Sequence, residues 1–261
     1  METEATASPE TSAAPVDGAT TRNWAWRRLL RGSAIVSLVL MAAGLVILGP
    51  DPVFIGLTVL LLVGVVLTRW KTRIGAIVIA LPSIAILVFT GSSAIFVVTH
   101  PIAFIDVFGG LFTILAVLGV VNLVAVVATL TESLVSALRS QRTSAVVAAL
   151  AVLVVVVVAA LGTAGRLGFT NATAAAGDSR IEMKPDTTYS TQSLDSTQDT
   201  NIYITNTDGT LHTFTIDGVV NQAVPANSQG KVSVKLKPGQ YHYYCAVPGH
   251  SATMNGTLTV H

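Results

Sequence analysis

Residues 241–260 read YHYYCAVPGHSATMNGTLTV and bring three potential metal ligands onto one short segment. Cys245 stands at the end of a predicted strand, and His250 and Met254 follow on the predicted loop behind it. A thiolate, an imidazole and a thioether are donors that suit soft and borderline transition metals. The segment therefore predicts a metal site at one end of a β-structure.

A fourth ligand is predicted upstream, at His212 in the sequence LHTF (211–214) on an earlier strand. One cysteine and two histidines with a weak axial methionine form the blue-copper electron-transfer arrangement. A lone cysteine or methionine is usually a core residue, and a lone strand histidine is usually polar surface, so the prediction depends on the combination. His242 alternates with Tyr243 and is expected on the opposite strand face, away from the metal. His261 is expected to be inert as well.

The last third of the chain has the pattern of an all-β domain. Short alternating runs are separated by turn sequences such as Lys237-Pro-Gly239 and Asn255-Gly256. Strands spaced in this way predict a β-sandwich or a small barrel. Seven strands are expected, at 180–184, 188–194, 201–206, 211–217, 231–236, 241–246 and 256–260.

Residues 180–261, and most sharply 241–260, resemble the cupredoxins, the blue copper proteins of the azurin and plastocyanin kind. The Cys-x4-His-x3-Met spacing is similar to that of the azurin copper loop. The resemblance implies an all-β Greek-key sandwich with one mononuclear type 1 copper site. It also implies a ligand set, which consists of His212, Cys245 and His250 as equatorial ligands and Met254 as the axial ligand.

Two residues beside the expected metal depart from azurin. Thr213 stands where azurin has asparagine after the first histidine, and Val247 stands where its loop has phenylalanine. The reduction potential and the loop rigidity of azurin therefore do not carry over. The azurin disulfide is impossible here, because Cys245 is the single cysteine.

Composition divides the chain into two unlike parts. The 261 residues are 51% hydrophobic and only 11% charged, and the mean hydropathy is +0.67. Long apolar runs fill the region from Ser33 to Gly165, which excludes a single soluble globule. A net charge of +1 excludes the strongly basic surface that nucleic-acid binding requires. One cysteine excludes a disulfide scaffold, a four-cysteine iron–sulfur cluster and a dinuclear copper centre with paired cysteines.

The apolar region predicts a multi-pass α-helical membrane domain of about five helices. A helix needs roughly 17–25 apolar residues to cross a bilayer. The alternative is four spans, with the third or fourth apolar run forming a re-entrant or interfacial segment. The five expected spans are 33–48, 53–68, 74–98, 102–130 and 144–165.

Five spans place the two ends of the chain on opposite sides of the membrane. Nearly all cations near span ends fall on the side of the N-terminus, which the positive-inside rule assigns to the cytoplasm. The C-terminal domain is then extracytoplasmic. The expected divisions are a disordered cytoplasmic tail (1–28), a membrane domain (29–167), a flexible linker (168–179) and a copper domain (180–261).

Few polar residues occur inside the expected spans, so the membrane half is interpreted as an anchor and scaffold. His100, Asp106 and Asn122 are expected to be interfacial or internally satisfied groups. The sequence leaves open whether this half binds a quinone, a haem or an ion of its own. The copper domain is expected to fold alone, and His100 and Asp106 are the first candidates if the membrane half does reach the metal site.

The resulting prediction is a membrane-anchored type 1 copper protein that transfers single electrons on the extracytoplasmic side. The edge of His250 is the expected electron port, beside an apolar docking patch that includes Val247 and Pro248. The expected partners are redox proteins of a membrane electron-transfer chain and the lipid bilayer. Copper storage, sensing or delivery is the alternative. An oxidase or nitrite reductase is disfavoured because the chain has no His-x-His motif and four ligands saturate the one site.

Overall fold

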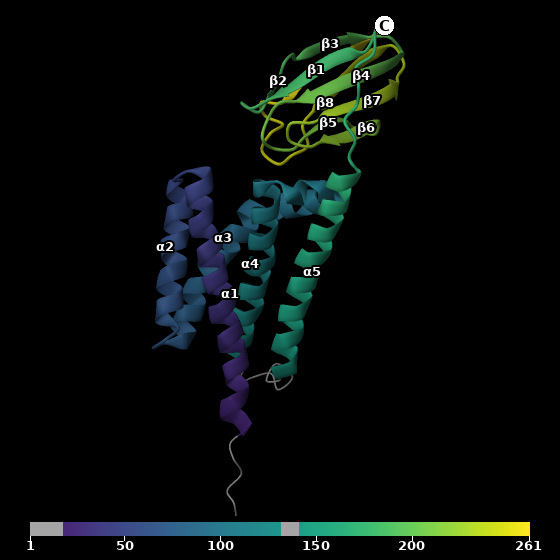
Figure 1. The fold of residues 1–261 in the computed structure, drawn as a ribbon. Helices are drawn as coiled ribbons and strands as arrows, with labels where there is room; N and C mark the ends of the chain where they lie inside the picture. The colour runs from purple at the N-terminus through teal and green to yellow at the C-terminus, as the bar shows by residue number, and fades with distance from the viewer. Residues whose placement is uncertain (1–17, 132–140) are drawn as a thin grey trace, which may run out of the picture.

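The computed structural model describes residues 18–131 and 141–261, and it has a helical part and a β domain (Figure 1). Within these described ranges, the helical part contains five α-helices and one short 3₁₀ helix. These are α1 (Gly18–Leu48), α2 (Pro52–Leu67), α3 (Thr72–Thr99), η1 (Pro101–Ile105), α4 (Val107–Thr131) and α5 (Gln141–Gly168). The expected fold class, about five helices followed by an all-β domain, is confirmed.

The helices run alternately toward and away from the β domain, so the start of α1 and the α2–α3 turn lie at the far end (Figure 1). By length and composition, α1, α3, α4 and α5 can each cross a membrane. Helix α2 is equally apolar but has only 16 residues, which give about 24 Å at 1.5 Å per residue. Among the described α-helices, α2 is therefore the shortest.

The turn before α2 follows from three residues of the segment 49–52. Gly49 has a φ of 94°, which favours glycine and ends α1. Asp51 caps α2 by accepting hydrogen bonds from the backbone N–H groups of Val53 and Phe54, at 2.8 and 3.0 Å. Pro52 occupies the first helical turn, where no intrahelical donor is needed.

The fourth expected span, 102–130, is divided in the structure. Residues Pro101–Ile105 form η1 at the end of the bundle next to the β domain, and α4 starts only at Val107. Gly109 permits this sharp re-entry, because a Cβ atom there would collide with the carbonyl oxygen of Ala103. Asp106 therefore lies in the connection that faces the β domain.

The ends of the helical part also differ from the expected divisions. Helix α1 begins at Gly18, inside the range expected as a tail, and residues 1–17 lie outside the described part. The linker after α5 is attached to the β domain at two points. The backbone N–H of Ala172 donates to the Gln229 carbonyl at 3.0 Å, and the Gln229 N–H donates to the Asn171 side chain at 3.0 Å.

The one asparagine expected within a span is internally satisfied. Asn122 on α4 is buried, and its carbonyl oxygen accepts a 2.6 Å hydrogen bond from the Ser33 hydroxyl of α1. Its amide donates to the Ser37 hydroxyl at 3.2 Å. The group joins two helices and needs no ligand to explain it.

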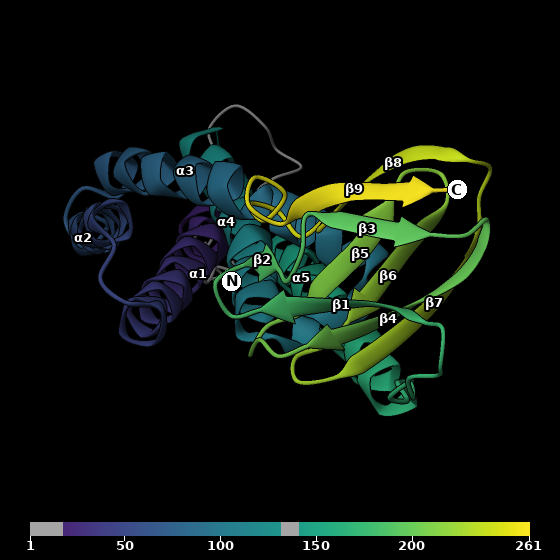
Figure 2. The same ribbon diagram turned by 90° about the horizontal axis from the view of Figure 1, so that it is seen from above.

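The β domain is a two-sheet sandwich that lies over α4, α5 and part of α3 and leaves α2 uncovered (Figure 2). One sheet has the order β2-β1-β4-β7 and the other β3-β9-β8-β5-β6. The strands are β1 (Ser179–Lys184), β2 (Thr188–Tyr189), β3 (Ser193–Ser196), β4 (Asp199–Asn206), β5 (His212–Ile216), β6 (Val220–Val224), β7 (Gln229–Lys235), β8 (Gly239–Tyr244) and β9 (Asn255–Val260).

Two more strands are present than the seven expected. The run 188–194 is split into β2 and β3, which belong to different sheets. Strand β6 was not predicted; its residue Asn221 is of a type that is depleted in strands. It pairs antiparallel with β5 along the full length of that strand, from His212–Val224 to Ile216–Val220. This pairing makes β5 an internal strand and buries all five of its residues, His212 included.

Candidate metal centre

The candidate ligands come from two adjacent strands of one sheet and from the loop between β8 and β9. His212 is the first residue of β5, and Cys245 directly follows β8. Within the loop, the Cys245 N–H donates to the Met254 carbonyl at 2.9 Å, and the Met254 N–H donates to the His250 carbonyl at 2.8 Å. Gly249, with a φ of 89°, permits the tight turn that presents His250.

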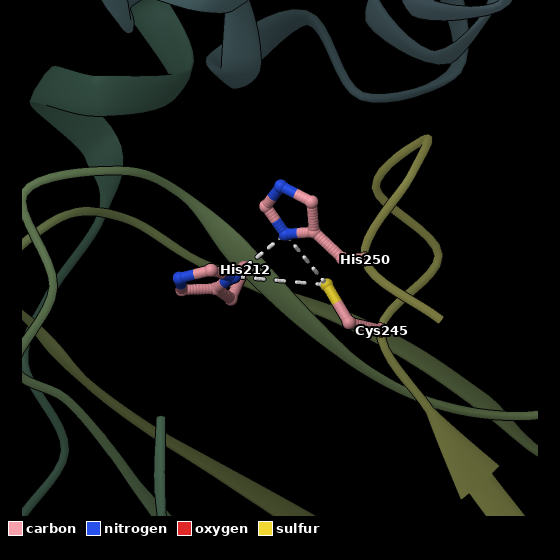
Figure 3. Close-up of side chains that lie close together, drawn as sticks. All are labelled: His212, Cys245 and His250. Carbon is pink, nitrogen blue, oxygen red and sulfur yellow. Dashed lines mark hydrogen bonds between the residues drawn. The ribbon is translucent and has the colours of Figure 1, made fainter. Parts of the chain in front are cut away.

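Three donor atoms meet in a small triangle, with both imidazoles and the thiol pointing toward one another (Figure 3). The Nδ1 atoms of His212 and His250 are 3.1 Å apart, and each lies 3.8 Å from the Cys245 Sγ. The point in the plane of the three atoms that is equidistant from them is about 2.1 Å from each. This distance is close to the roughly 2.0–2.3 Å of zinc bonds to imidazole and thiolate. The triangle therefore fits one metal ion, and it is the one such group among the described residues.

Burial prepares the two imidazoles for a metal. His212 and Cys245 are fully buried, and His250 is half-buried. Burial lowers the pKa of His212, and burial together with the neighbouring His212 lowers the pKa of His250 to about 4. Both rings are therefore neutral at pH 7 and keep a lone pair for coordination. Burial raises the pKa of the Cys245 thiol, which a bound cation would counteract.

Met254 lies close to the loop residues of the site, whereas His242 and His261 lie away from it. Met254 is fully buried in the same core cluster as Cys245, at the end of the loop that carries His250. His242 is exposed on the opposite face of β8, where its ring stacks on Tyr244. His261 is exposed and lies 3.4 Å from the carboxylate of Asp195.

Asp208 is a partner of the site that sequence reasoning missed. Its Oδ2 lies 2.8 Å from the Nε2 of His212, so the imidazole donates from Nε2 and turns Nδ1 toward the triangle. The same side chain accepts hydrogen bonds from the Gly209 N–H and the Thr210 hydroxyl. In the sequence, Asp208 is recognisable only as a turn residue. The one feature that could have pointed to its role is its position four residues before His212.

Thr213 is a second partner of the site, at the position that departs from azurin. Its hydroxyl oxygen accepts a 2.7 Å hydrogen bond from the Ala246 N–H, and its own N–H points at the Cys245 Sγ at 3.4 Å. Thr213 thus ties the loop to β5 and supports the thiol.

The helical part touches this end of the β domain. Asp106, between η1 and α4, accepts a 2.5 Å hydrogen bond from the N–H of Leu211, the residue before His212. Burial raises the pKa of Asp106 to about 6, an effect that this hydrogen bond and the charge of Arg166 oppose. His100 does not join the site; its ring stacks on Phe96 instead.

Comparison with known proteins identifies the class of the C-terminal domain. Residues 148–260 match the family model of the cupredoxin-like domain, so this part of the chain, which begins within α5 and includes most of that helix, is cupredoxin-like. Its cluster of two histidines, a cysteine and a methionine is like a type 1 copper site. No curated protein matches the chain.

Several solved structures resemble the chain over about a third of its length. A Cu(I) form of an amicyanin mutant has 19% identity over 36% of this chain and 90% of its own, with a TM-score of 0.31. An azurin from Methylomonas sp. strain J has 17% identity over 33% and 99%, with a TM-score of 0.30. Auracyanin A from Chloroflexus aurantiacus, a blue copper protein, has 19% identity over 31% and 96%, with a TM-score of 0.29.

Proposed function

We propose that the protein is a membrane-anchored type 1 copper protein that transfers single electrons on the extracytoplasmic side of the membrane. The observation that carries the proposal is the buried triangle of His212 Nδ1, His250 Nδ1 and Cys245 Sγ inside a cupredoxin-like domain. Met254, buried at the end of the same loop, would be the weak axial ligand. Copper held by this donor set supplies a one-electron change between Cu(II) and Cu(I).

The protein's own residues are arranged to hold the ligands still. Asp208 orients the ring of His212, and Thr213 connects the loop backbone to β5. Packing fixes Cys245 and Met254 in the core of the sandwich. Because the donors are held in place from outside the metal, little rearrangement would accompany a change in its charge. This rigidity favours electron transfer over an enzymatic role that needs an open coordination position.

The distribution of cations supports the proposed orientation. The end of the helical part away from the β domain carries Arg27, Arg28, Arg31, Arg69, Lys71, Arg73 and Arg142 (Figure 1). Near the β domain, the last turn of α5 has Arg166. By the positive-inside rule the cation-rich end is cytoplasmic. The β domain then faces the other compartment, where redox proteins of a membrane chain would be its partners.

The test of electron transfer is an anaerobic redox titration of the purified, copper-loaded full-length protein, followed in its visible absorption. We expect a reversible one-electron transition with the same copper content in both directions. Loss of copper on reduction would contradict the carrier function and favour copper storage or delivery instead.

The orientation predicts different labelling of two exposed positions. A cysteine introduced at Ala174, in the linker beside the β domain, is expected to react with a membrane-impermeant maleimide in intact cells. A cysteine at Lys71, in the turn at the opposite end, should react only after permeabilisation. The parent protein is the control, because Cys245 is buried. The reverse pattern of labelling would invert the orientation.

A further inference from the structure

A cavity of about 310 Å³ lies between the β8–β9 loop and the helical part. The β domain contributes Val247 and His250 to its wall, and the helical part contributes Phe96 of α3, Asp106, and Phe108 and Phe112 of α4. Small-molecule sites typically have volumes of about 300–1,000 Å³, an apolar lining and a few convergent polar groups. The cavity matches this description at the lower end of the size range.

The cavity is at the edge of the metal centre from which an electron would leave or enter. The Nδ1 of His250 faces Cys245 and His212, while its other ring edge points away from them toward the helices (Figure 3). Among the described residues, the Nε2 of His250 has no hydrogen-bond partner. This group is therefore available to a molecule in the cavity.

The expected docking patch for a partner protein is partly covered by the chain's own helices. Val247 packs against a cluster formed by Val97, Ala103 and Leu211. The hydrogen bond from the Leu211 N–H to Asp106 holds the helical part against the same side of the β domain. Weak redox complexes still bury several hundred Å² on each partner, which a cavity of this size cannot offer. A small molecule fits where a protein surface does not.

The lining selects for a flat, neutral, hydroxylated ring. Phe96, Phe108 and Phe112 give aromatic walls, against which a ring packs well. The carboxylate of Asp106 accepts a hydrogen bond from a hydroxyl group, and the Nε2–H of a metal-bound His250 donates one to an oxygen. Asp106 and Asp208 together disfavour an anion. The position at the ends of α3 and α4 also favours a molecule that dissolves in the bilayer.

We propose that this cavity binds a lipid-soluble hydroquinone, which donates its electrons to the metal centre through His250. The inference rests on the proposed function, because it names the electron donor of that same site. A hydroquinone loses two electrons and two protons when it becomes a quinone. Each electron reduces one Cu(II) to Cu(I), so one hydroquinone reduces two protein molecules, or one molecule twice with reoxidation by a partner protein between. Both protons pass to water.

Binding is tested first without copper. Metal-free full-length protein in lipid nanodiscs is titrated anaerobically with duroquinol by calorimetry, and saturable binding is expected. Durene, the same methylated ring without oxygens, should bind at least about tenfold more weakly, because it cannot use the polar groups. Equal affinity for the two compounds would identify a non-specific hydrocarbon pocket and overturn the proposal.

Two matched variants locate the site. Phe108→Ala removes one aromatic wall and should weaken duroquinol binding by about tenfold. Phe89→Ala is the control, because Phe89 lies on α3 outside the cavity and has a similar exposed fraction, 53% against 44% for Phe108. Equal affinities in the two variants would place the ligand elsewhere and overturn the assignment.

Reduction of the copper-loaded protein completes the test. Duroquinol should reduce two equivalents of Cu(II) per molecule, and Phe108→Ala should slow this reaction at subsaturating concentrations without slowing reduction by ferrocyanide. Absence of duroquinol binding beside a reversible redox titration would overturn the hydroquinone site alone. Binding to the metal-free protein beside an irreversible titration would overturn the carrier function, and with it the electron-donating role of the ligand.

Discussion

Replacement of Cys245 by serine is expected to abolish the intense visible absorption of the copper-loaded protein. That absorption arises from charge transfer between thiolate sulfur and Cu(II), and a hydroxyl is a hard, poor ligand for this site. The fold should survive, because serine is isosteric and the Thr213 N–H that points at Sγ can donate to a hydroxyl instead. Absorption spectra of the parent and the variant, at equal copper-to-protein ratio, measure the effect.

His242→Ala is the matched control for this experiment. His242 is on the strand that leads to Cys245, but it is exposed on the other face and stacks on Tyr244. The variant should keep the visible band at full intensity. A folded His242→Ala protein without colour would show that the wrong histidine has been assigned to the metal.

The ligand-bearing loop could be predicted from sequence because its geometry is local. Cys245, His250 and Met254 are separated by four and three residues, so one loop necessarily keeps them close. Strand alternation was enough to separate Cys245 from His242, and the structure places them on opposite faces as expected. His212 could not be placed by spacing alone, because it is 33 residues from Cys245. It was chosen because it lies on an earlier strand and completes a donor set of one cysteine and two histidines, and the resemblance to the cupredoxins implied the same residue.

The groups that support the ligands could not be predicted in the same way. Asp208 acts through a hydrogen bond to the outer nitrogen of His212, and Thr213 acts through the backbone of Ala246. Both residues have ordinary roles in strands and turns, so nothing in their type marks them. Their positions depend on how β5 and the loop meet, which is a property of the tertiary structure.

Hydropathy predicted the helices but not how the two halves meet. Apolar length gave the number of helices, whereas η1 depends on a close approach of Gly109 to Ala103. The hydrogen bond between Asp106 and Leu211 joins residues 105 positions apart. At that separation, the pattern of the sequence does not indicate which residues will meet. The linker was expected to be a flexible tether, and its attachment to Gln229 depends on a similar distant contact.

Removal of the Asp208 side chain is expected to weaken copper binding by about 10–100-fold, the usual cost of losing a group that orients a metal-bound histidine. In Asp208→Ala the ring of His212 loses the acceptor at 2.8 Å that fixes its tautomer. Competition against a chelator of known affinity measures the change. Thermal unfolding of the metal-free variant measures separately the loss of the hydrogen bonds to Gly209 and Thr210.

Asp208→Asn separates orientation from charge, because the amide oxygen can still accept from the Nε2–H of His212. If orientation is what matters, asparagine should restore most of the affinity that alanine loses, and the visible spectrum should remain that of the parent. A variant as weak as Asp208→Ala would show instead that the negative charge itself stabilises the bound cation. Unchanged affinity in Asp208→Ala would mean that the burial of His212 on β5, where it is paired with Val224 of β6, is sufficient to hold the ring, and that Asp208 contributes only to its turn.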